Sequence, residues 1–485
     1  MVKKAIFKGS IFLFIIMLII VYLGPIFTVK ISHRYKLIQG LYEHTGNAYD
    51  VALMGSSHMN SGIDPNVLWN EYGITSMNYA TGGQTIDVTY YVLKEALKNH
   101  KFSVVVVDLY YLGLTGKYGD EGYIRNVLDN MRFSENKFEA ILNCTPSNQW
   151  IAYFFPFYKY HNRWKDLKQE DFKPDDSTDY FTKGFGAGHD MYGKDSLSDI
   201  STTETSDIPP KTKDYLYKFI DLSKKEGFKL VFMNAPHDYT ETESSTDWVK
   251  EPAKMFNKVA EISKENGIPF INYNNMFDEI GFDFKTDMYN MGHMNVQGAQ
   301  KVSTNLGKFL KDNYKLADHR NDPKYSKWNE DYDIDAQTEA ALYLTEEQSI
   351  KKYISMLKNK NYIVAVSCNN FTLFNDNKLL KKGLTDIGLK AGQSDMDDNY
   401  IAVINNNSVV SETSSSTGLK YSFTLEDGIS LSDATSNDDT SMPSIMINGH
   451  EYSSGSSGFN IVVYDKLLNR VVDSICLDSN NRIKR

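Results

Sequence analysis

A serine and a histidine far apart in the chain have the surroundings expected of a nucleophile and its base. Ser57 follows the apolar run at residues 51–55, so we place it at the carboxyl end of a strand, just before a helix. There its hydroxyl is exposed, and the N–H groups of the helix N-terminus lie beside a developing oxyanion. His293 stands in a polar loop before the last helix of the same region. Because a serine hydroxyl needs an adjacent base and histidine suits that role, the pair predicts nucleophilic catalysis.

Strands and helices must bring these two residues to the same edge of a sheet. Short apolar runs alternate with helix-like stretches on either side of a long irregular middle, about residues 116–210, which we interpret as an insertion. We expect strands at 51–55, 104–109, 229–233 and 269–272, and helices at 87–97, 214–225, 252–265 and 296–310. This alternation predicts an α/β domain over residues 37–316, with a mostly parallel sheet between two layers of helices. Sites on such sheets lie at the carboxyl ends of the strands.

Further polar residues are candidates for the wall of the pocket. His58 follows Ser57 directly, and since adjacent side chains at such a turn point apart, we interpret it as a pocket-wall or structural residue. Asn234 and His237 follow the third strand, where lining the site and capping a loop are equally good interpretations. His161 lies in the aromatic insertion, as part of a substrate wall or of an ordinary lid.

The composition of the whole chain excludes some classes of protein and site. Its 485 residues are enough for two or three domains, and its net charge of -10 argues against a nucleic-acid partner. Cys144, Cys368 and Cys476 are too scattered for a disulfide scaffold or a zinc site. We therefore expect no structural metal and no cofactor. Cys368 and Cys476 are either buried thiols, which we favour, or a pair joined in an oxidising compartment.

An N-terminal apolar segment predicts a membrane anchor. Residues 9–29 carry no charged side chain, and at about 1.5 Å rise per residue they span a hydrocarbon core of about 30 Å. The segment is long for a signal peptide and has no small-x-small cleavage site, so we interpret residues 1–36 as an uncleaved, single-pass anchor. Basic residues flank both ends, and the positive-inside rule does not orient the helix. The expected chemistry favours an extracellular location for the bulk of the chain.

Two motifs resemble those of a known family. Gly55-Ser56-Ser57 resembles the first block of the SGNH (GDSL-like) hydrolases, in which the last residue is the nucleophile. The segment SMNYATGGQTI is similar to the second block, which supplies an oxyanion glycine, here Gly83 or, next, Gly82. The resemblance covers roughly residues 45–315 and includes the membrane-anchored bacterial branch of DltD and the alginate-acetylation proteins. It implies an SGNH-type three-layer α/β/α domain.

Two departures from the family pattern concern the oxyanion hole and the third catalytic residue. The third block normally offers an Asn, but the strand here reads VVVVDLYYLG, and an ionised Asp108 cannot donate. The hole then rests on backbone N–H groups of Ser57 and Gly83. The fourth block normally has an Asp three residues before the histidine, where this chain has Asn290, whose amide orients an imidazole without stabilising its charge. Asp287, six residues before the histidine, is the alternative, and we rank it slightly ahead of Asn290.

A charged stretch, residues 317–340, predicts a linker to a second domain at 341–485. That domain opens with the helix-like TEEQSIKKYISMLKNK, continues with the strand YIVAVSC and ends in alternating segments typical of paired strands. The stretches SETSSSTG and SDATSNDDTS predict loops. YISMLKNKNYIVAVSC, LKKGLTDIGLKAGQSDMDDNYIAVINN and GFNIVVYDKLLNRVVDSICLDS resemble the interleukin-like epithelial to mesenchymal transition inducer (ILEI) domain, in a permuted order. The resemblance implies a smaller α+β domain that binds or positions glycans, with packing or dimerisation as the alternative.

The resemblances imply two functions of different classes. The first is an esterase or O-acyltransferase that acts on acyl groups of an extracellular glycopolymer through Ser57 and His293. Its implied partners are the glycopolymer, the membrane and a membrane-bound O-acyltransferase. The second is a glycan-binding or scaffold protein that keeps the SGNH fold with weak or no chemistry, which Asn290 and the missing third-block Asn favour.

Overall fold

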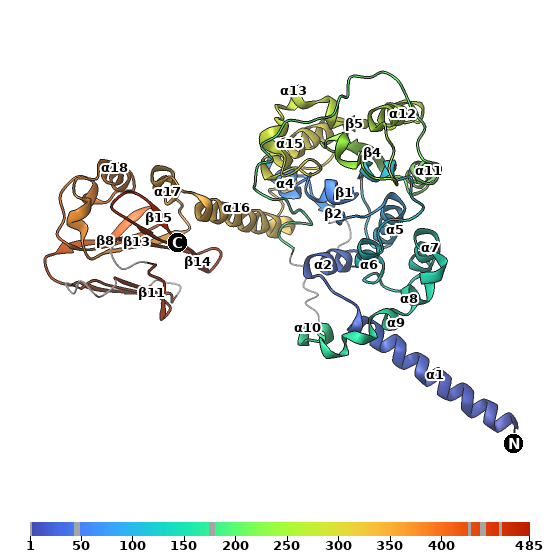
Figure 1. Ribbon diagram of the computed structural model, residues 1–485, viewed down its shortest axis with the longest axis horizontal. Helices are drawn as coiled ribbons and strands as arrows, with labels where there is room; N and C mark the ends of the chain where they lie inside the picture. Colours follow the sequence, from blue (N-terminus) through green and yellow to red (C-terminus); the bar gives the residue numbers. More distant parts are fainter. Residues whose placement is uncertain (1, 43–48, 174–179, 425–427, 437–442, 455–457) are drawn as a thin grey trace. The chain divides into compact units, whose positions relative to one another are not determined.

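The structure, a computed structural model, describes residues 2–42, 49–173, 180–424, 428–436, 443–454 and 458–485. The chain divides into two compact units, Met1–Tyr332 (unit 1) and Asp333–Arg485 (unit 2) (Figure 1). Each unit has its own buried hydrophobic clusters, and no described residue belongs to clusters of both units. We describe the two units separately.

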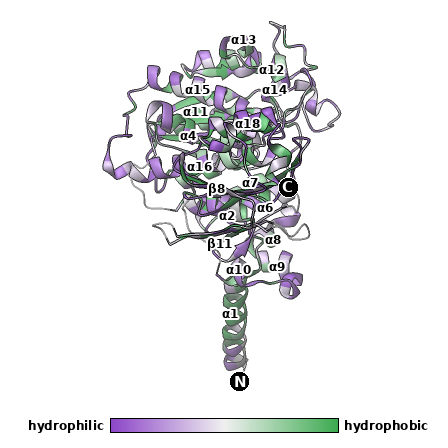
Figure 2. Cartoon of the chain, turned by 90° about the vertical axis from the view of Figure 1, so that its left-hand side faces the viewer, coloured by the Kyte–Doolittle hydropathy of each residue, from purple (hydrophilic) through white to green (hydrophobic). Residues whose placement is uncertain are grey.

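Unit 1 begins with a long apolar helix, α1 (Val2–Phe27). Its segment Ile6–Phe27 is long and apolar enough to cross a membrane, although a signal sequence meets the same criteria of length and composition. Figure 2 shows α1 as a hydrophobic helix with a hydrophilic N-terminal tip. A second helix, α2 (Ser32–Gly40), follows, and its Leu37 and Ile38 are buried in the core of unit 1.

A five-stranded sheet forms the centre of unit 1, with neighbouring strands parallel and the order β2-β1-β3-β4-β5. The strands are β1 (Val51–Met54), β2 (Ser76–Asn78), β3 (Val104–Asp108), β4 (Lys229–Asn234) and β5 (Phe270–Asn272). β1 and β3 are buried along their whole length, which explains why their sequences are continuous apolar runs. The parallel sheet confirms the α/β prediction. The sequence prediction lacks β2, because Ser-Met-Asn contains no apolar run.

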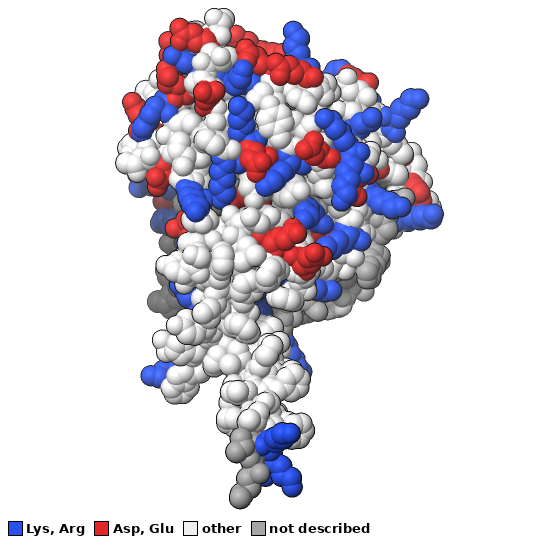
Figure 3. Space-filling model, turned by 90° about the vertical axis from the view of Figure 1, so that its right-hand side faces the viewer, with Lys and Arg blue, Asp and Glu red and all other residues white. Residues whose placement is uncertain are grey.

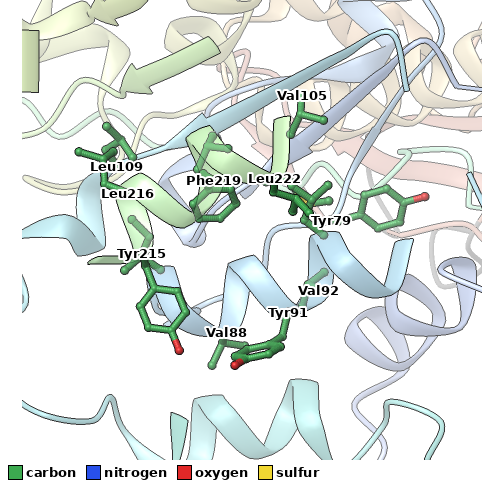
Figure 4. Packing of buried hydrophobic residues seen from close by; sticks show 14 of the residues in the cluster. Tyr79, Val88, Tyr91, Val92, Val105, Leu109, Tyr215, Leu216, Phe219 and Leu222 are labelled. Carbon is green, nitrogen blue, oxygen red and sulfur yellow. The ribbon is translucent and has the colours of Figure 1, made fainter. Parts of the chain in front are cut away.

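Helices cover both faces of this sheet, as the sequence predicts. On one face lie α5 (Ile86–Ala96), α11 (Pro210–Glu226) and α12 (Pro252–Glu265), and on the other α4 (Pro65–Tyr72) and α15 (Val296–Asn313). The side chains of β3 alternate between the layers, with Val105 in the first cluster and Val106 in the second. Figure 4 shows the first layer, where Phe219 of α11 and Val92 of α5 belong to the same packed cluster.

The segment expected to be irregular, residues 116–210, is helical in its first half, so that expectation is wrong there. It contains α6 (Glu121–Leu128), α7 (Glu135–Cys144), α8 (Trp150–Phe154), α9 (Pro156–Tyr160), the 3-10 helix η3 (His161–Lys165) and α10 (Gln169–Phe172). N-caps start the two longer helices: Asp120 accepts from the N–H of Gly122 at 2.8 Å, and Ser134 from that of Lys137 at 3.1 Å. The helices are short, which hides their periodicity in the sequence.

Unit 2 contains two antiparallel sheets and the helices α16 (Ser326–Glu346), α17 (Ile350–Met356) and α18 (Lys378–Asp386), with the unit boundary inside α16. The sheets have the orders β15-β14-β13-β6-β7-β8 and β12-β11-β10-β9. Their strands are β6 (Tyr362–Cys368), β7 (Asn399–Asn405), β8 (Ser408–Ser415), β9 (Lys420–Thr424), β10 (Ser430–Ala434), β11 (Ser444–Ile447), β12 (His450–Glu451), β13 (Phe459–Asp465), β14 (Arg470–Leu477) and β15 (Ile483–Lys484).

The expected linker, residues 317–340, contains the boundary between the two units. From Ser326 on it belongs to α16, where Ala, Gln and Glu favour a helix even without a strong apolar face. The prediction of loops in SETSSSTG and SDATSNDDTS is wrong in part, because these stretches contain part of β8 and part of β10. β8 is an edge strand with mostly exposed side chains, and its Ser and Thr residues suit that position. Residues 437–441 of the second stretch lie outside the described residues.

The three cysteines are separate thiols. Cys144, Cys368 and Cys476 are all free and buried, which agrees with the interpretation that we favoured. Burial raises the pKa of Cys368 to about 12, so its thiol stays protonated at neutral pH.

Candidate active site

Ser57 is positioned by a tight passage from β1 into the short helix α3 (Ser57–Asn60). A Cβ atom on Gly55 would lie 2.9 Å from Cβ of Asp108, so only glycine lets the chain pass so close to β3. Ser56 precedes the helix as its N-cap, with Oγ accepting from the N–H of His58 at 3.4 Å. This arrangement leaves Ser57 half-buried at the carboxyl edge of the parallel sheet.

His293 is held in a closed loop before α15. Met288 and Met294 form a β-bridge across the loop, and the N–H of Tyr289 donates to the carbonyl of His293 at 2.8 Å. At its end, Asn295 caps α15 by accepting from the N–H of Gly298 at 3.0 Å. The backbone of His293 is therefore fixed on both sides, and its ring is presented from a rigid support.

The structure brings the two predicted residues together. Nε2 of His293 lies 2.8 Å from Oγ of Ser57, and Nδ1 lies 3.1 Å from Oδ1 of Asn290. Because an amide oxygen only accepts, we assign the proton to Nδ1, which leaves Nε2 free to accept the hydroxyl proton of Ser57. Burial lowers the pKa of His293 below its usual value, so the ring is a neutral base at neutral pH. A hydroxyl, a base and a group that orients the base are the parts that nucleophilic catalysis requires.

Of the two candidates for the third member, the structure places Asn290 and not Asp287 on the imidazole. Asp287 is buried with its carboxylate turned away, accepting from the N–H of Asp283 at 2.8 Å and from Nζ of Lys301 at 2.6 Å. Our ranking of Asp287 ahead of Asn290 is therefore corrected. Its carboxylate pairs with Lys301 and closes the turn at Asp283, so Asp287 stabilises the loop.

His58 forms a ring stack behind the base. Its ring centroid lies 3.5 Å from that of Tyr110 and 4.8 Å from that of His293, in near-parallel planes. His58 is buried, and burial, followed by the nearby His293, lowers its pKa well below the usual value. Because His58 is neutral, it does not act as a charged group in the site. It packs against the rear face of the His293 ring, in the place of a wall residue.

Glu241 is a carboxylate near the base that sequence reasoning missed. It lies on the 3-10 helix η4 (Tyr239–Thr242), and its Oε2 accepts from the hydroxyl of Tyr110 at 3.1 Å. The same oxygen is 3.7 Å from Nε2 of His58, and this contact is not an ion pair because His58 is neutral. Gly292 leaves room for Glu241: a Cβ there would lie only 2.1 Å from Oε1 and 2.4 Å from Cδ of its carboxyl group.

The charge of Glu241 acts on His293. Burial lowers the pKa of His293, and the carboxylate of Glu241 opposes that shift. In the sequence, Glu241 is marked only by its place in the loop after β4, the loop in which Asn234 and His237 were candidates. A residue about fifty positions from His293 is brought to it by the fold alone.

Asn234 and His237 lie at the end of β4 with different contacts. Nδ2 of Asn234 donates to Oδ1 of Asn272 at 2.9 Å and to the hydroxyl of Tyr239 at 3.2 Å, so Asn234 ties the strand ends together. The His237 ring lies 5.4 Å from the ring of His58, and its Nδ1 is 2.9 Å from the carbonyl oxygen of Ala235. Burial lowers the pKa of His237 to about 4. His237 therefore belongs to the inner wall, whereas Asn234 is a structural residue.

The glycines proposed for the oxyanion hole lie in the loop after β2. Gly83 has φ +67°, and a Cβ there would lie 2.2 Å from Cγ of Tyr123. A Cβ on Gly82 would lie 2.9 Å from the guanidinium of Arg34. Packing requires glycine at position 83, whereas at position 82 the flexible end of Arg34 can move aside. An oxyanion role for either glycine stays a prediction.

Asp108 ends β3 beside the serine turn. Its carboxyl oxygens accept from the N–H groups of Ala235 at 3.2 Å and Tyr110 at 3.3 Å. Burial raises its pKa to about 7, against those hydrogen bonds. Asp108 is thus partly protonated near neutrality, so the statement that an ionised Asp108 cannot donate holds only for its charged form.

His161 lies in a different place from the serine site. It is exposed on η3, where its Nδ1 is 3.0 Å from the carbonyl oxygen of Tyr158, and it lines a cleft beside Leu13 and Ile16 of α1. The structure therefore does not join His161 to Ser57, and our interpretation of it as part of the substrate wall is corrected. Within the described part of the chain, no cluster of three or more His, Cys, Asp or Glu side chains is arranged to hold a metal ion.

Comparison with known proteins adds little to this site. No model of a protein family matches the chain, and no curated protein sequence matches it. Among solved structures, one match is the crystal structure of a "putative acylhydrolase" from Bacteroides fragilis, with 10% sequence identity and a TM-score of 0.29, covering 57% of this chain and 94% of that chain. A likeness at that TM-score carries no argument, so the case for the site rests on its geometry.

Proposed function

We propose that unit 1 is an SGNH-type serine esterase or O-acyltransferase, anchored in the cell membrane by α1, which acts outside the cell on acyl groups of a glycopolymer. The observation that carries this proposal is the 2.8 Å hydrogen bond between Oγ of Ser57 and Nε2 of His293 at the carboxyl edge of a parallel sheet. The order of the two residues supports it. Ser57 follows β1 and His293 precedes α15, which are the places of the first and last blocks in the family that the sequence resembles.

In the proposed reaction, Nε2 of His293 takes the proton of Ser57 as Oγ bonds to the acyl carbonyl carbon. Backbone N–H groups of Ser57 and Gly83 hold the oxyanion of the tetrahedral intermediate. The C–O bond to the sugar then breaks, and His293 returns the proton to the leaving sugar oxygen, which gives acyl-Ser57. Water, or the hydroxyl of another sugar, gives its proton to His293 and attacks the acyl carbon; the bond from that carbon to Oγ of Ser57 then breaks, and His293 returns the proton to Oγ. Water yields hydrolysis, and a sugar hydroxyl yields transfer.

The second candidate function is a binding or scaffold protein that has kept the fold without efficient chemistry. The partner of His293 Nδ1 is the neutral amide of Asn290, which orients the ring but does not stabilise the imidazolium that forms in the reaction. Glu241 is the observation against this alternative, because it supplies a negative charge near the same ring.

For unit 2 we propose a role in binding or positioning the glycan, on the resemblance of its segments to the ILEI domain. For a transfer reaction, we propose a membrane-bound O-acyltransferase as the partner that delivers the acyl group. Both proposals follow from the sequence resemblance, and the antiparallel sheets of unit 2 are compatible with the first.

A covalent probe of the serine tests the catalytic proposal. The full chain, in detergent, is treated with a fluorophosphonate and with a nitrophenyl acetate, and the Ser57→Ala variant is treated in parallel. We expect labelling and turnover in the native chain and neither in the variant. Ser61→Ala is the matched control, since Ser61 lies one turn further on and its hydroxyl donates to the carbonyl of Ser57 at 2.8 Å. A native chain that neither reacts nor turns over the ester supports the binding protein, and labelling that survives Ser57→Ala removes Ser57 as nucleophile.

A further inference from the structure

Exposed apolar side chains lie beside α1 where this helix meets the rest of unit 1. They come from the loop after α6 and from α7 to α10, and we call them the collar: Phe133, Phe138, Ile151, Phe155, Tyr158 and Phe172. Their exposed fractions range from 37% for Phe155 to 73% for Phe133. Large apolar side chains gathered in this way on the surface mark an interaction site.

The collar and α1 face each other across two clefts. The first, of about 650 Å³, is lined by Met17, Ile20 and Val21 of α1, by Phe133, Phe138, Phe155 and Phe172, and also by the charged residues Lys30, Asp129, Arg132, Lys137 and Asp171. The second, of about 470 Å³, is lined by Leu13, Ile16, Met17 and Ile20 of α1 and by Ile151, Phe155 and Tyr158. Phe155 lines both clefts, so the collar continues the apolar surface of the helix on two sides.

The C-terminal end of α1 is packed into unit 1 and is not a free tether. The rings of Phe27 and Phe157 meet edge to face with centroids 5.0 Å apart. Arg163 donates to the carbonyl of Phe27 at 2.5 Å and to Oδ1 of Asp171 at 2.9 Å, and Lys30 donates to the carbonyl of Pro25 at 2.5 Å. These cations cap the last carbonyl groups of the helix, where its dipole is negative. The collar is therefore held at a fixed height along α1.

That height is inside the apolar span. The cleft residues Ile20 and Leu13 precede Phe27, the end of the span, by seven and fourteen positions, or about 10 and 21 Å along a helix. A helix segment from Ile6 to Phe27 just covers a hydrocarbon core of about 30 Å. When α1 crosses a bilayer, side chains that face Ile20 must lie at or below the headgroup level. Figure 3 shows a largely uncharged belt on this face, between the basic tip of α1 and the mixed charges of the rest of the molecule.

We propose that the collar is immersed in the lipid bilayer, in the leaflet that the C-terminal end of α1 reaches, and that acyl chains fill the two clefts beside α1. Interfacial elements of this kind bury about 5–10 Å into the boundary of headgroups and acyl chains, and aromatic side chains favour that depth. Unit 1 is then seated on the membrane at a fixed height and tilt, and its serine site has a fixed distance from the surface. This inference rests on the membrane anchoring in the proposed function, and it is independent of catalysis by Ser57.

Depth-dependent quenching in lipid tests the proposal. The full chain is placed in phospholipid nanodiscs without any other protein, and single cysteines at four exposed positions carry a fluorescent label. The three native cysteines are buried, which limits background labelling. Ile151→Cys and Tyr158→Cys report on the collar, and Leu13→Cys reports on the span. Leu197→Cys, with an equally exposed apolar residue at 77%, is the control on unit 1 away from the collar. Lipids with a nitroxide at a shallow or a deep carbon of the acyl chain are the quenchers.

The four labels separate the possible outcomes. We expect several-fold stronger quenching at Ile151, Tyr158 and Leu13 than at Leu197, with a similar dependence on nitroxide depth at Ile151, Tyr158 and Leu13, because all three line the same cleft. Quenching at Leu13 with none at Ile151 and Tyr158 overturns the collar proposal while anchoring stands, and it points to a partner protein that covers the collar instead. Absence of quenching at Leu13 overturns the anchoring, and the collar proposal with it.

Discussion

The amide of Asn290 decides which nitrogen of His293 carries a proton. Its Oδ1 accepts from Nδ1 of His293 at 3.1 Å and from the N–H groups of Gly292 and His293, both at 2.9 Å. Asn290→Ala removes all three bonds, so we expect kcat/KM for a nitrophenyl ester to fall by about 100-fold, in line with the loss of an orienting group. Asn290→Asp keeps the acceptor and adds charge, and we expect activity at least equal to that of the native chain.

Asp287→Asn is the matched control for this prediction. Asp287 pairs with Lys301 at 2.6 Å and makes no hydrogen bond to His293. We expect a lower melting temperature, because a neutral amide replaces the charged partner of Lys301, with the turnover of the folded protein nearly unchanged. A larger loss of turnover in Asp287→Asn than in Asn290→Ala would show that the carboxylate reaches the imidazole after all.

Glu241 is predicted to tune the base. The groups around the His293 ring are Ser57, Asn290, the stacked neutral His58 and the carboxylate of Glu241, which raises the pKa of His293 against the lowering by burial. Glu241→Gln removes the raising effect, so the pKa of His293 falls further. Since the neutral ring is the active form, activity rises as pH increases through that pKa, and the acidic limb of kcat/KM moves to lower pH in the variant.

The value of kcat should fall in Glu241→Gln, even though the acidic limb moves to lower pH. His293 becomes charged in the transition state, and loss of the nearby carboxylate reduces kcat by on the order of tenfold, the effect of about 1.4 kcal/mol. Glu243→Gln, on an exposed side chain two residues away, is the control. A titration of His293 by NMR gives the same pKa without turnover, and an unshifted titration in Glu241→Gln would remove the electrostatic role of this residue.

Whole elements were easier to predict from the sequence than the contacts between them. The apolar runs of β1 and β3 and the amphipathic pattern of α11, α12 and α15 are local properties, and the structure has these elements at the expected residues within a few positions. β2 and the short helices α8 to α10 leave little periodicity. Their positions depend on packing against the rest of unit 1.

The same distinction applies to the site. The pairing of Ser57 with His293 follows from two strand-end loops that meet at one edge of a sheet. The choice between Asn290 and Asp287 depends on how one loop folds back, and Lys301 on α15 decides it by taking the carboxylate. Glu241 reaches the site from a third loop, so no spacing along the chain predicts its presence there.

The loop from β2 to α5 gives a prediction at the scale of elements. Gly83→Ala places a Cβ 2.2 Å from Cγ and 2.6 Å from Cβ of Tyr123, so the start of that side chain on α6 is in the way and cannot swing aside. Gly193→Ala is the control, since Gly193 also has a positive φ, +72°, with nothing within 4 Å of the added atom. We expect the control to lose about 1 kcal/mol from its backbone conformation, and Gly83→Ala to lose a further 1–3 kcal/mol or so from overpacking.

Denaturant unfolding measures both variants. A second change, Tyr123→Ala, should return part of the stability that Gly83→Ala removes, because it takes away the clashing ring. If Gly83→Ala is no less stable than Gly193→Ala, α6 does not lie against this loop.

The molecule as a whole is expected to unfold in two steps. Unit 2 has a hydrophobic cluster of its own, in which Phe459 is fully buried with ring centroids 5.8 Å from Phe371 and 6.0 Å from Tyr400. The clusters of unit 1 share none of these residues. Phe459→Ala therefore removes packing in one unit, with an expected cost of about 3–5 kcal/mol. We expect one calorimetric transition to move to lower temperature and the other to stay.

The fluorophosphonate assigns the transitions, because its reaction needs only a folded serine site. We expect the rate of Ser57 labelling at ambient temperature, and the temperature at which labelling is lost, to be the same in Phe459→Ala and in the native chain. Phe219→Ala, which removes an equally buried ring from the core of unit 1, is the reciprocal variant and should lower the temperature at which labelling is lost. A single transition that moves in both variants would mean that the two units fold as one cooperative body, so that any glycan-binding role of unit 2 would be coupled to the stability of the catalytic unit.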